Sequence, residues 1–186
     1  DEFYKAMAAG AVTKTSQDNT EEFITYFTPF LEQGMDILHV SLSSGLSGAF
    51  GAANMAKEAL ASRFPQRKIR LVDSLGASSG YGLLMDKLAD LRDAGADIDT
   101  LYAWAQANRL RLHHWFFSTD LTFYVRGGRI SKASGWFGTM LKICPLLNMD
   151  SQGRLIPRVK VRGKKAVIQE IVRKMEQYAE EGTAYS

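Results

Sequence analysis

The chain has 186 residues, of which 46% are apolar and 23% charged, and its formal net charge is +3. These values are typical of a globular protein with one well-packed domain or two small ones. A single cysteine, Cys144, excludes an internal disulfide and a cysteine-based metal site, and its apolar neighbours indicate a buried, inert thiol. No apolar run is long enough to cross a bilayer and no signal peptide opens the chain, so we expect a cytoplasmic protein without a transmembrane segment.

Strands alternate with helices through the first two thirds of the sequence. In chain order, the patterns predict a helix over 2–9, a helix opened by a capping box of Asn19 and Glu22 and closed by Gly34, a strand over 36–42, a helix over 48–62, a strand over 68–73, helices over 81–91 and 97–112, and a β-prone aromatic segment over 113–119. This alternation predicts a parallel α/β sheet with flanking helices.

Each of the two predicted strands is followed by a loop rich in serine and glycine, over 43–48 and 74–80. Ligands of parallel α/β sheets bind beyond the carboxyl ends of the strands, where both loops are expected to lie. The first loop also opens a helix, whose free amides and dipole stabilise an anion. We therefore predict anion recognition there, with Ser47 as a hydroxyl donor. Two alternatives stay open for Ser47: a helix cap, or the nucleophile of a serine hydrolase or acyltransferase, although the Gly-x-Ser-x-Gly pattern is incomplete.

The last third of the chain has a different character. Arg129 follows two glycines and precedes a serine, a presentation that suits carboxylate or phosphate recognition, although a surface arginine after a flexible turn is the plainer interpretation. The patterns then predict a helix through Lys142, strands over 143–149 and 154–159 joined by the turn 150–153, and an amphipathic helix over 164–181. We place a domain boundary after residue 112, with an α/β domain over 1–112 and a second α+β domain over 113–186.

Several other groups of residues favour ordinary structural roles. We interpret His39 as a core histidine, and we expect His113 and His114 to point to opposite faces of a strand, where they cannot ligate one metal. No carboxylates have metal-ligand spacing, and no Walker-type loop is present, so we expect neither a metal site nor nucleotide binding by this chain alone. A basic cluster over 154–165 has no interleaved aromatics, which favours a solvated face or a protein contact over nucleic acid.

The aromatic and methionine side chains of the last third allow two interpretations. They can form a core, or they can line an apolar tunnel that leads from a polar mouth, and periodicity does not separate the two. The residues concerned are Phe116, Phe117, Phe123, Tyr124, Trp136, Phe137, Met140 and Leu141.

Five separated segments resemble, in sequence and in order, the motifs of the DegV family of bacterial fatty-acid-binding proteins. They are Thr15-Ser16-Gln17, Ser43-Ser44-Gly45-Leu46-Ser47-Gly48, Val72-Asp73-Ser74, Gly127-Gly128-Arg129-Ile130-Ser131-Lys132-Ala133 and the basic turn Lys160-Val161-Arg162-Gly163-Lys164-Lys165. The resemblance covers nearly the whole chain. It implies a two-domain α/β fold that buries one long-chain fatty acid between its domains, with no cofactor.

The resemblance also implies a role and a set of site residues. The chain would be the lipid-binding subunit of a fatty acid kinase, not an enzyme by itself, and would present the fatty acid to an ATP-binding, dihydroxyacetone-kinase-like partner that forms an acyl phosphate. By motif position, the carboxylate site consists of Thr15, Ser16, Ser44, Ser47, Gly48 and Arg129. Arg162 would face the partner. A plain interaction domain that binds a partner without lipid is a further alternative.

The sequence departs from the family pattern at its ends. An initial strand with an Asp-Ser-Thr-like loop and a later His-x-Gly-Pro-Gly-like segment are missing, and the chain does not begin with Met. We therefore expect a chain truncated at both ends. Asp18-Asn19 replaces a common Pro-Ser, and Ala49 replaces a common Thr, which we expect to alter the shape of the mouth while leaving the carboxylate contacts in place.

Overall fold

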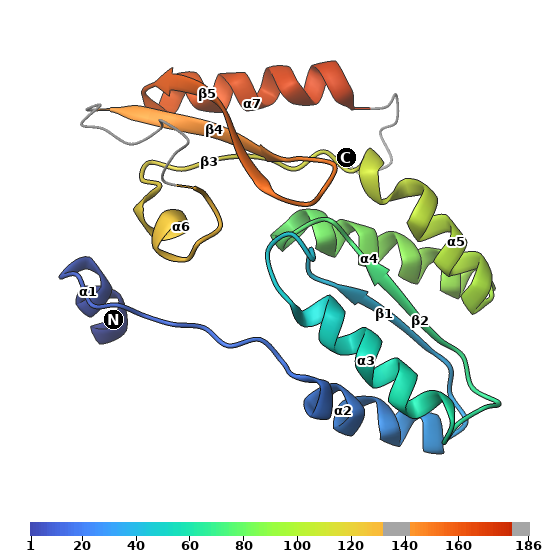
Figure 1. Cartoon of the computed structure of the whole chain (residues 1–186). Helices are drawn as coiled ribbons and strands as arrows, with labels where there is room; N and C mark the ends of the chain where they lie inside the picture. The colour runs from blue at the N-terminus through green and yellow to red at the C-terminus, as the bar shows by residue number, and fades with distance from the viewer. Residues whose placement is uncertain (132–141, 180–186) are drawn as a thin grey trace.

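The computed structural model describes residues 1–131 and 142–179. Helices and strands follow one another along the chain as shown in Figure 1. The helices are α1 (Glu2–Ala8), α2 (Thr20–Glu32), α3 (Ala49–Ala61), α4 (Ser78–Asp93), α5 (Ile98–Asn108), the 3₁₀ turn η1 (Arg109–Arg111), α6 (Thr122–Arg126) and α7 (Lys164–Tyr178). The strands are β1 (Ile37–Ser41), β2 (Ile69–Asp73), β3 (Trp115–Phe117), β4 (Ile143–Met149) and β5 (Leu155–Arg162).

The first layered unit is built on the parallel pair β1 and β2, which α3 connects. Ile37 lies opposite Ile69, and Ser41 lies opposite Asp73, so the two strands end at the same edge. Side chains alternate between the faces of each strand. One face packs on α2 and α3 around Phe27 and other buried side chains, and the opposite face packs on α4 and α5. Figure 1 shows the helices on either side of the strand pair.

The second unit is an antiparallel sheet in the order β3-β4-β5. α7 covers one face through Val167, which is fully buried against Cys144 and Leu146. α6 lies on the other face, where Leu121 and Leu147 form a small separate core. Cys144 is only 4% exposed and forms no disulfide, which confirms the prediction of a buried thiol.

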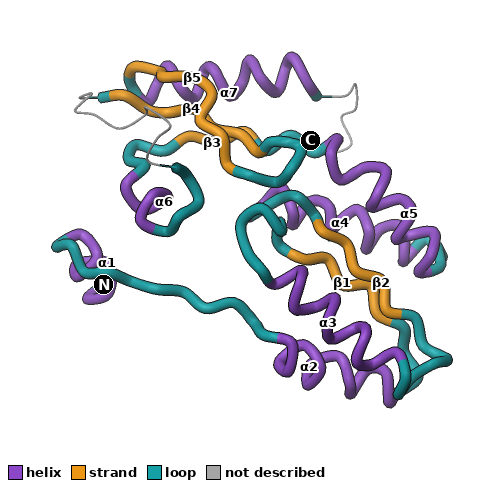
Figure 2. The backbone as a smooth tube through the Cα atoms, viewed as in Figure 1, coloured by secondary structure: helices purple, strands orange, loops and turns teal. Residues whose placement is uncertain are grey.

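The amino-terminal segment consists of the short helix α1 and the chain that leads to α2. A long loop joins α1 to α2 (Figure 2), and α1 contributes no buried side chain. The capping box at the start of α2 is formed as predicted: the Asn19 side chain accepts from the Glu22 amide, and the Glu22 carboxylate accepts from the Asn19 amide. The capping box therefore sets the point at which the loop ends and α2 begins.

The mixed α/β class with a parallel sheet and flanking helices is confirmed, and several boundaries differ from the predicted ones. The helix expected over 97–112 ends at Asn108 and continues as a 3₁₀ turn. Segment 113–119 yields only the three-residue strand β3, which pairs antiparallel with β4. α4 begins three residues earlier than predicted, at Ser78.

Part of the prediction falls on residues that the structure does not describe. The helix expected to run through Lys142 lies almost entirely over 132–141, outside the described residues, as do Trp136, Phe137, Met140 and Leu141. The two described sheets fall on either side of residue 112, and the domain division there stays a prediction. Within residues 1–131 and 142–179, no helix is both long and apolar enough to span a membrane.

Candidate functional site

A polar pocket of about 630 Å³ opens beside the carboxyl end of β1. Four of the six predicted carboxylate-site residues line it, and they come from three separated segments. These residues are Thr15, Ser16, Ser47 and Arg129. Gln17, Asp18, His39, Ser41 and Tyr81 also line this pocket, together with Phe23, Val40, Leu42 and Ala49. The structure therefore brings three of the sequence motifs to one place.

The other two predicted residues are placed differently. Ser44 does not line the polar pocket, and its amide donates to the Asp73 carboxylate at 3.1 Å. The Gly48 amide donates to Oε1 of Gln17 at 2.6 Å. The amide that we expected to face an anion is therefore hydrogen-bonded to the Gln17 side chain. A Cβ on Gly48 would lie 2.7 Å from the same oxygen, so any larger residue would require the Gln17 side chain to shift. The sequence motif contains Gln17, but nothing in the sequence indicates its contact with Gly48.

Asp73 joins the loops that follow β1 and β2. Its Oδ1 accepts from the amides of Ser44 and Leu75, each at 3.1 Å. The side chain is only 7% exposed, and burial of a carboxylate is costly unless hydrogen bonds compensate for lost water. The Val72-Asp73-Ser74 motif thus fixes the two Ser/Gly loops relative to each other.

Ser47 lies at the start of α3 and is half-buried. Its hydroxyl oxygen accepts from the Ala49 amide at 3.2 Å, and the hydroxyl donates to Oε1 of Gln17 at 3.4 Å. Among the described residues, these are the hydrogen bonds of this side chain, and neither partner is a base. A nucleophilic serine needs a general base within hydrogen-bond reach, so the geometry favours the donor and cap interpretations over the hydrolase.

Arg129 reaches the polar pocket from a tight turn after α6. The Arg129 amide donates to the Tyr124 carbonyl at 2.8 Å, and Gly128 adopts a φ of +74°, which favours glycine. The guanidinium donates to the Leu46 carbonyl at 3.3 Å and to the Gly127 carbonyl. The second unit thereby supplies a fixed positive charge beside the serine loop of the first.

His39 is a pocket residue that the sequence interpretation assigned to the core. Its ring packs against those of Phe23 and Phe27, with centroid distances of 5.3 and 5.5 Å. Its Nε2 is buried and has no hydrogen-bond partner among the described residues. Burial lowers the pKa of this imidazole, and nearby Asp18 opposes the shift. His39 and Ser41 are two residues apart in β1 and so lie on the same face of the strand. This spacing was the one feature of the sequence that indicated a position for His39 near the serine loop after β1.

An apolar pocket of about 350 Å³ adjoins the polar one. It lies between the first turn of α4 and the sheet of the second unit. Its lining is mostly apolar and aromatic and also contains two serines and two histidines: Leu46, Ala77, Ser78, Ser79, Gly80, His113, His114, Trp115, Phe116, Tyr124, Met149 and Leu155. Leu46 lines the apolar pocket while the next residue, Ser47, lines the polar one, and Gly80 and Tyr81 divide in the same way. Two pairs of neighbouring residues therefore contribute one member to each pocket, which places the pockets next to each other.

The described aromatic residues of this region have different surroundings. Phe116 and Tyr124 line the apolar pocket, while Phe117 packs in the core against α7. Phe123 is 44% exposed and lines a separate groove beside α1. Phe116 and Tyr124 also pack against the core of Leu121 and Leu147, so lining the pocket and packing in the core are combined in the same side chains, and the tunnel stays a prediction.

The remaining candidates lie away from the polar pocket. Arg162 is exposed at the end of β5. His113 stacks on Tyr178, whereas His114 contacts Gly76 and Gly80, so the two rings have different neighbours. Burial lowers the pKa of His114, and His113 lowers it further. In the described part of the chain, no three His, Cys, Asp or Glu side chains are grouped so that they could hold a metal ion.

Comparisons with known proteins match this architecture. The family model described as "Uncharacterised protein, DegV family" matches residues 1–186. The DegV domain-containing protein YteA of Lactococcus lactis is 39% identical over 169 residues, which cover 91% of this chain and 58% of the relative. A fatty-acid-binding DegV family protein from Thermus thermophilus has a TM-score of 0.83 and 31% identity, over 97% of this chain and 62% of that one.

A third comparison involves a named kinase component. The Streptococcus pneumoniae Fatty Acid Kinase (Fak) B3 protein, solved with linoleic acid, has a TM-score of 0.83 and 25% identity, over 95% of this chain and 62% of that one. This chain spans about three fifths of the length of the relatives it matches, 58% for YteA and 62% for both solved structures. The family match extends over all 186 residues, and the chain belongs to the DegV family.

Proposed function

We propose that the chain binds one long-chain fatty acid, with the carboxylate in the polar pocket and the acyl chain in the apolar pocket. The observation that carries this proposal is the convergence of Thr15, Ser16, Ser47 and Arg129 on one pocket that adjoins an apolar one. Relatives described as fatty-acid-binding share the fold, which supports the same ligand class.

The polar pocket has the donors that a carboxylate requires. A carboxylate that leaves water needs several hydrogen bonds or a cation to offset its desolvation. The hydroxyls of Thr15, Ser16 and Ser47 are short-range donors, and Arg129 contributes charge. A carboxylate bound by Ser47 would replace the 3.4 Å contact of its hydroxyl with Gln17, which is long for an O–H···O bond.

The apolar pocket provides a favourable environment for the acyl chain. Burial of hydrocarbon contributes about 0.8 kcal/mol per methylene group. The volume of about 350 Å³ falls in the range of small-molecule sites. Affinity should therefore rise with acyl chain length until the pocket is filled.

The finer proposal is that the bound carboxylate is presented to a separate ATP-binding kinase. One carboxylate oxygen would attack the γ-phosphorus, ADP would leave, and an acyl phosphate would form. Arg129 would stabilise the charge on the transferred phosphoryl group, because guanidinium groups pair well with phosphate oxygens. The exposed Arg162 at the end of β5 would contact the partner. The likeness to the Fak B3 protein supports this role.

Native mass spectrometry of the purified chain, followed by denaturation and identification of released molecules, tests the lipid proposal. We expect one long-chain fatty acid per chain. Ser47→Ala should weaken fatty acid binding by about 10- to 100-fold, because a hydrogen bond to a charged group contributes roughly 1.5–3 kcal/mol. Ser62→Ala removes an exposed hydroxyl at the end of α3 and serves as the matched control. Equal affinities of the two variants would contradict the assigned head-group site.

Hydroxylamine trapping of acyl phosphate tests the kinase proposal, with the chain, ATP and a dihydroxyacetone-kinase-like partner present. Arg129→Gln should abolish most of the product even at fatty acid concentrations that saturate the variant. Arg162→Glu should raise the concentration of chain needed for half-maximal rate, because it reverses a charge at the proposed interface. Exposed Arg63→Gln, which alters a cation over Phe64, is the control. Unchanged product formation by Arg129→Gln and Arg162→Glu would contradict the proposal that the chain presents the fatty acid to a kinase.

A further inference from the structure

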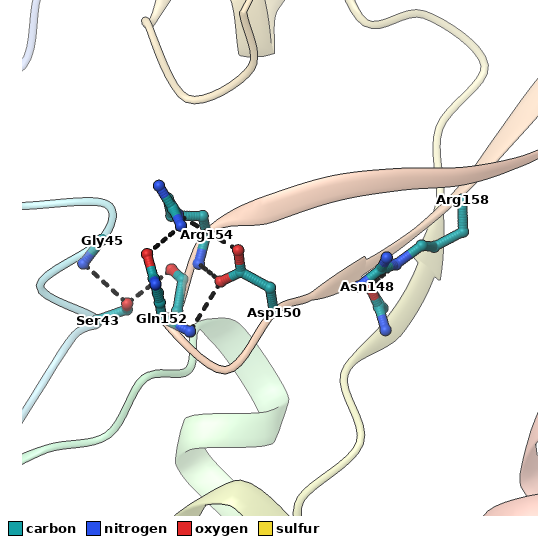
Figure 3. A network of polar contacts seen from close by, with 8 residues as sticks. Ser43, Gly45, Asn148, Asp150, Gln152, Arg154 and Arg158 are labelled. Atoms are coloured by element: carbon teal, nitrogen blue, oxygen red, sulfur yellow. Dashed lines mark hydrogen bonds and ion pairs between the residues drawn. The ribbon is translucent and has the colours of Figure 1, made fainter. Parts of the chain in front are cut away.

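The turn that joins β4 to β5 contacts both Ser/Gly loops of the first unit. We call residues 150–153 the hairpin turn and residues 43–48 the head-group loop. The Ser43 hydroxyl donates to the Gly153 carbonyl at 2.7 Å across 110 residues of sequence. Ser43 is fully buried, and Figure 3 shows its side chain directed toward the hairpin turn. The two units of the fold are therefore joined by a buried hydrogen bond.

Backbone contact at this junction is close on both sides. A Cβ on Gly153 would overlap Oγ of Ser43 and lie 3.0 Å from Cα of Leu75. A Cβ on Gly45 would lie 2.6 Å from the Gln152 carbonyl oxygen and 2.7 Å from that of Gly153. The glycines at 45 and 153 are thus required by space, and Gly153 is also required by its φ of +68°.

The hairpin turn is itself rigidly organised. The Asp150 carboxylate accepts from the amides of Gln152 and Arg154, each at 2.9 Å, and from the Arg154 side chain at 3.3 Å. Arg154 also donates to the Gln152 side chain. Figure 3 shows this network beside Ser43 and Gly45. The turn therefore presents the Gly153 carbonyl in a fixed position.

Ser43 organises the head-group loop through each of its polar groups. Its amide donates to the Gly76 carbonyl at 3.0 Å, and its hydroxyl oxygen accepts from the Gly45 amide at 3.1 Å. Its carbonyl accepts from the amides of Leu46 and Ser47, at 3.0 and 3.1 Å. Whatever holds Ser43 therefore also sets the position of Ser47, which lines the polar pocket.

We propose that the hairpin turn is a positioning element for the head-group loop, so that displacing the turn moves Ser47 and weakens carboxylate binding. Gly153 and Ser43 act through Ser47 and do not touch the ligand. The effect on affinity rests on the proposed fatty acid function, whereas the mechanical coupling between turn and loop is independent of it. Two measurements keep these two claims apart.

The first measurement is amide hydrogen exchange over 45–47 in the unliganded 186-residue chain. Gly153→Ala should speed exchange of these amides about tenfold, because loss of one buried contact corresponds to roughly 1.4 kcal/mol. Exchange at Val40 and Val72 in the strands should stay unchanged. Gly95→Ala is the matched control, since Gly95 has a φ of +95° and a Cβ there would meet no atom within 4 Å. Equal exchange over 45–47 in the two variants would overturn the proposal.

The second measurement is the affinity for palmitate. Gly153→Ala should bind about tenfold more weakly than Gly95→Ala. Adding Ser43→Ala removes the atom that the new Cβ would overlap, so the double variant should recover at least part of the affinity. Ser43→Ala alone provides a milder test if Gly153→Ala does not fold, and should loosen the same amides. No binding by the unsubstituted chain would contradict the proposed function and leave the exchange result to decide the coupling. Equal palmitate affinities of Gly153→Ala and Gly95→Ala would overturn the positioning role.

Discussion

The two Ser/Gly loops are alike in composition and follow neighbouring parallel strands, yet they form different parts of the site. The loop after β1 brings Ser47 to the polar pocket, while residues 77–80 after β2 line the apolar pocket. Ser74 in the second loop is only 2% exposed, and its hydroxyl oxygen accepts from the Gly76 amide at 3.1 Å. Serine composition therefore does not distinguish a ligand donor from a structural hydroxyl. Burial and the available partners make that distinction.

The largest expected effect comes from filling space at the second loop. A Cβ on Gly80 would overlap the imidazole of His114, which lines the apolar pocket. Gly80→Val should displace this ring and weaken palmitate binding about 100-fold, since overpacking costs roughly 1–3 kcal/mol. Gly82→Val in the same helix is the matched control, because a Cβ there would meet no atom within 4 Å. Isothermal titration of both variants measures the difference, and similar affinities would show that the acyl chain does not use this pocket.

Two serine substitutions, one in each loop, should differ in their effects on the free energy of unfolding and on fatty acid affinity. Ser74→Ala should lower the free energy of unfolding by about 1–3 kcal/mol, because it leaves the buried Gly76 amide without its partner. Ser47→Ala should change stability much less, because Ser47 is half-buried, yet reduce fatty acid affinity more. Urea unfolding and ligand titration of the two variants check this. The opposite ranking in either measurement would contradict the assignment of Ser74 as a structural hydroxyl and Ser47 as a ligand donor.

A smaller effect concerns acid stability at the first loop. Burial lowers the pKa of His39 below its usual 6.5, so the unfolded chain takes up a proton more readily than the folded one. Stability should therefore fall as pH drops below about 6.5, until the folded histidine also protonates. Asp18 shares its pocket and raises the pKa, so it opposes part of the effect of burial. His39→Leu should reduce the loss of melting temperature between pH 7.5 and 5.5.

His113→Leu is the comparison for this pH experiment, because His113 stacks on Tyr178 away from the polar pocket. The melting temperatures of both variants and the unsubstituted chain are followed by circular dichroism at each pH. An identical pH dependence for His39→Leu and the unsubstituted chain would remove His39 as a source of acid sensitivity.

Local chemistry made much of the fold predictable. The capping box of Asn19 and Glu22 acts over three residues, and the strand over 36–42 is rich in the apolar residues Ile37, Leu38, Val40 and Leu42. β3 was harder to predict, because the extent and the antiparallel orientation of a three-residue strand depend on its pairing with β4 and not on its own sequence. α6 forms over only five residues beneath the second sheet, where tertiary packing decides the backbone conformation.

In the site, too, short sequence motifs were predictable, whereas contacts between residues distant in the sequence were not. Motif order indicated Thr15, Ser47 and Arg129, which line one pocket. It also indicated Ser44 and Gly48, whose amides the structure pairs with Asp73 and Gln17. The contact between Gln17 and Gly48 spans 31 residues, and that between Ser43 and Gly153 spans 110. Such pairings depend on how the units pack, and no local sequence pattern encodes them.

The most direct test of the account compares saturated fatty acids of increasing length with their methyl esters, by titration into the purified chain. We predict that affinity for the free acids rises with each added methylene, by up to about 0.8 kcal/mol, until the apolar pocket is full. At every length the methyl ester should bind at least tenfold more weakly, because it loses the charge-assisted hydrogen bonds in the polar pocket. Equal binding of acid and ester would contradict a carboxylate held beside Ser47 and Arg129.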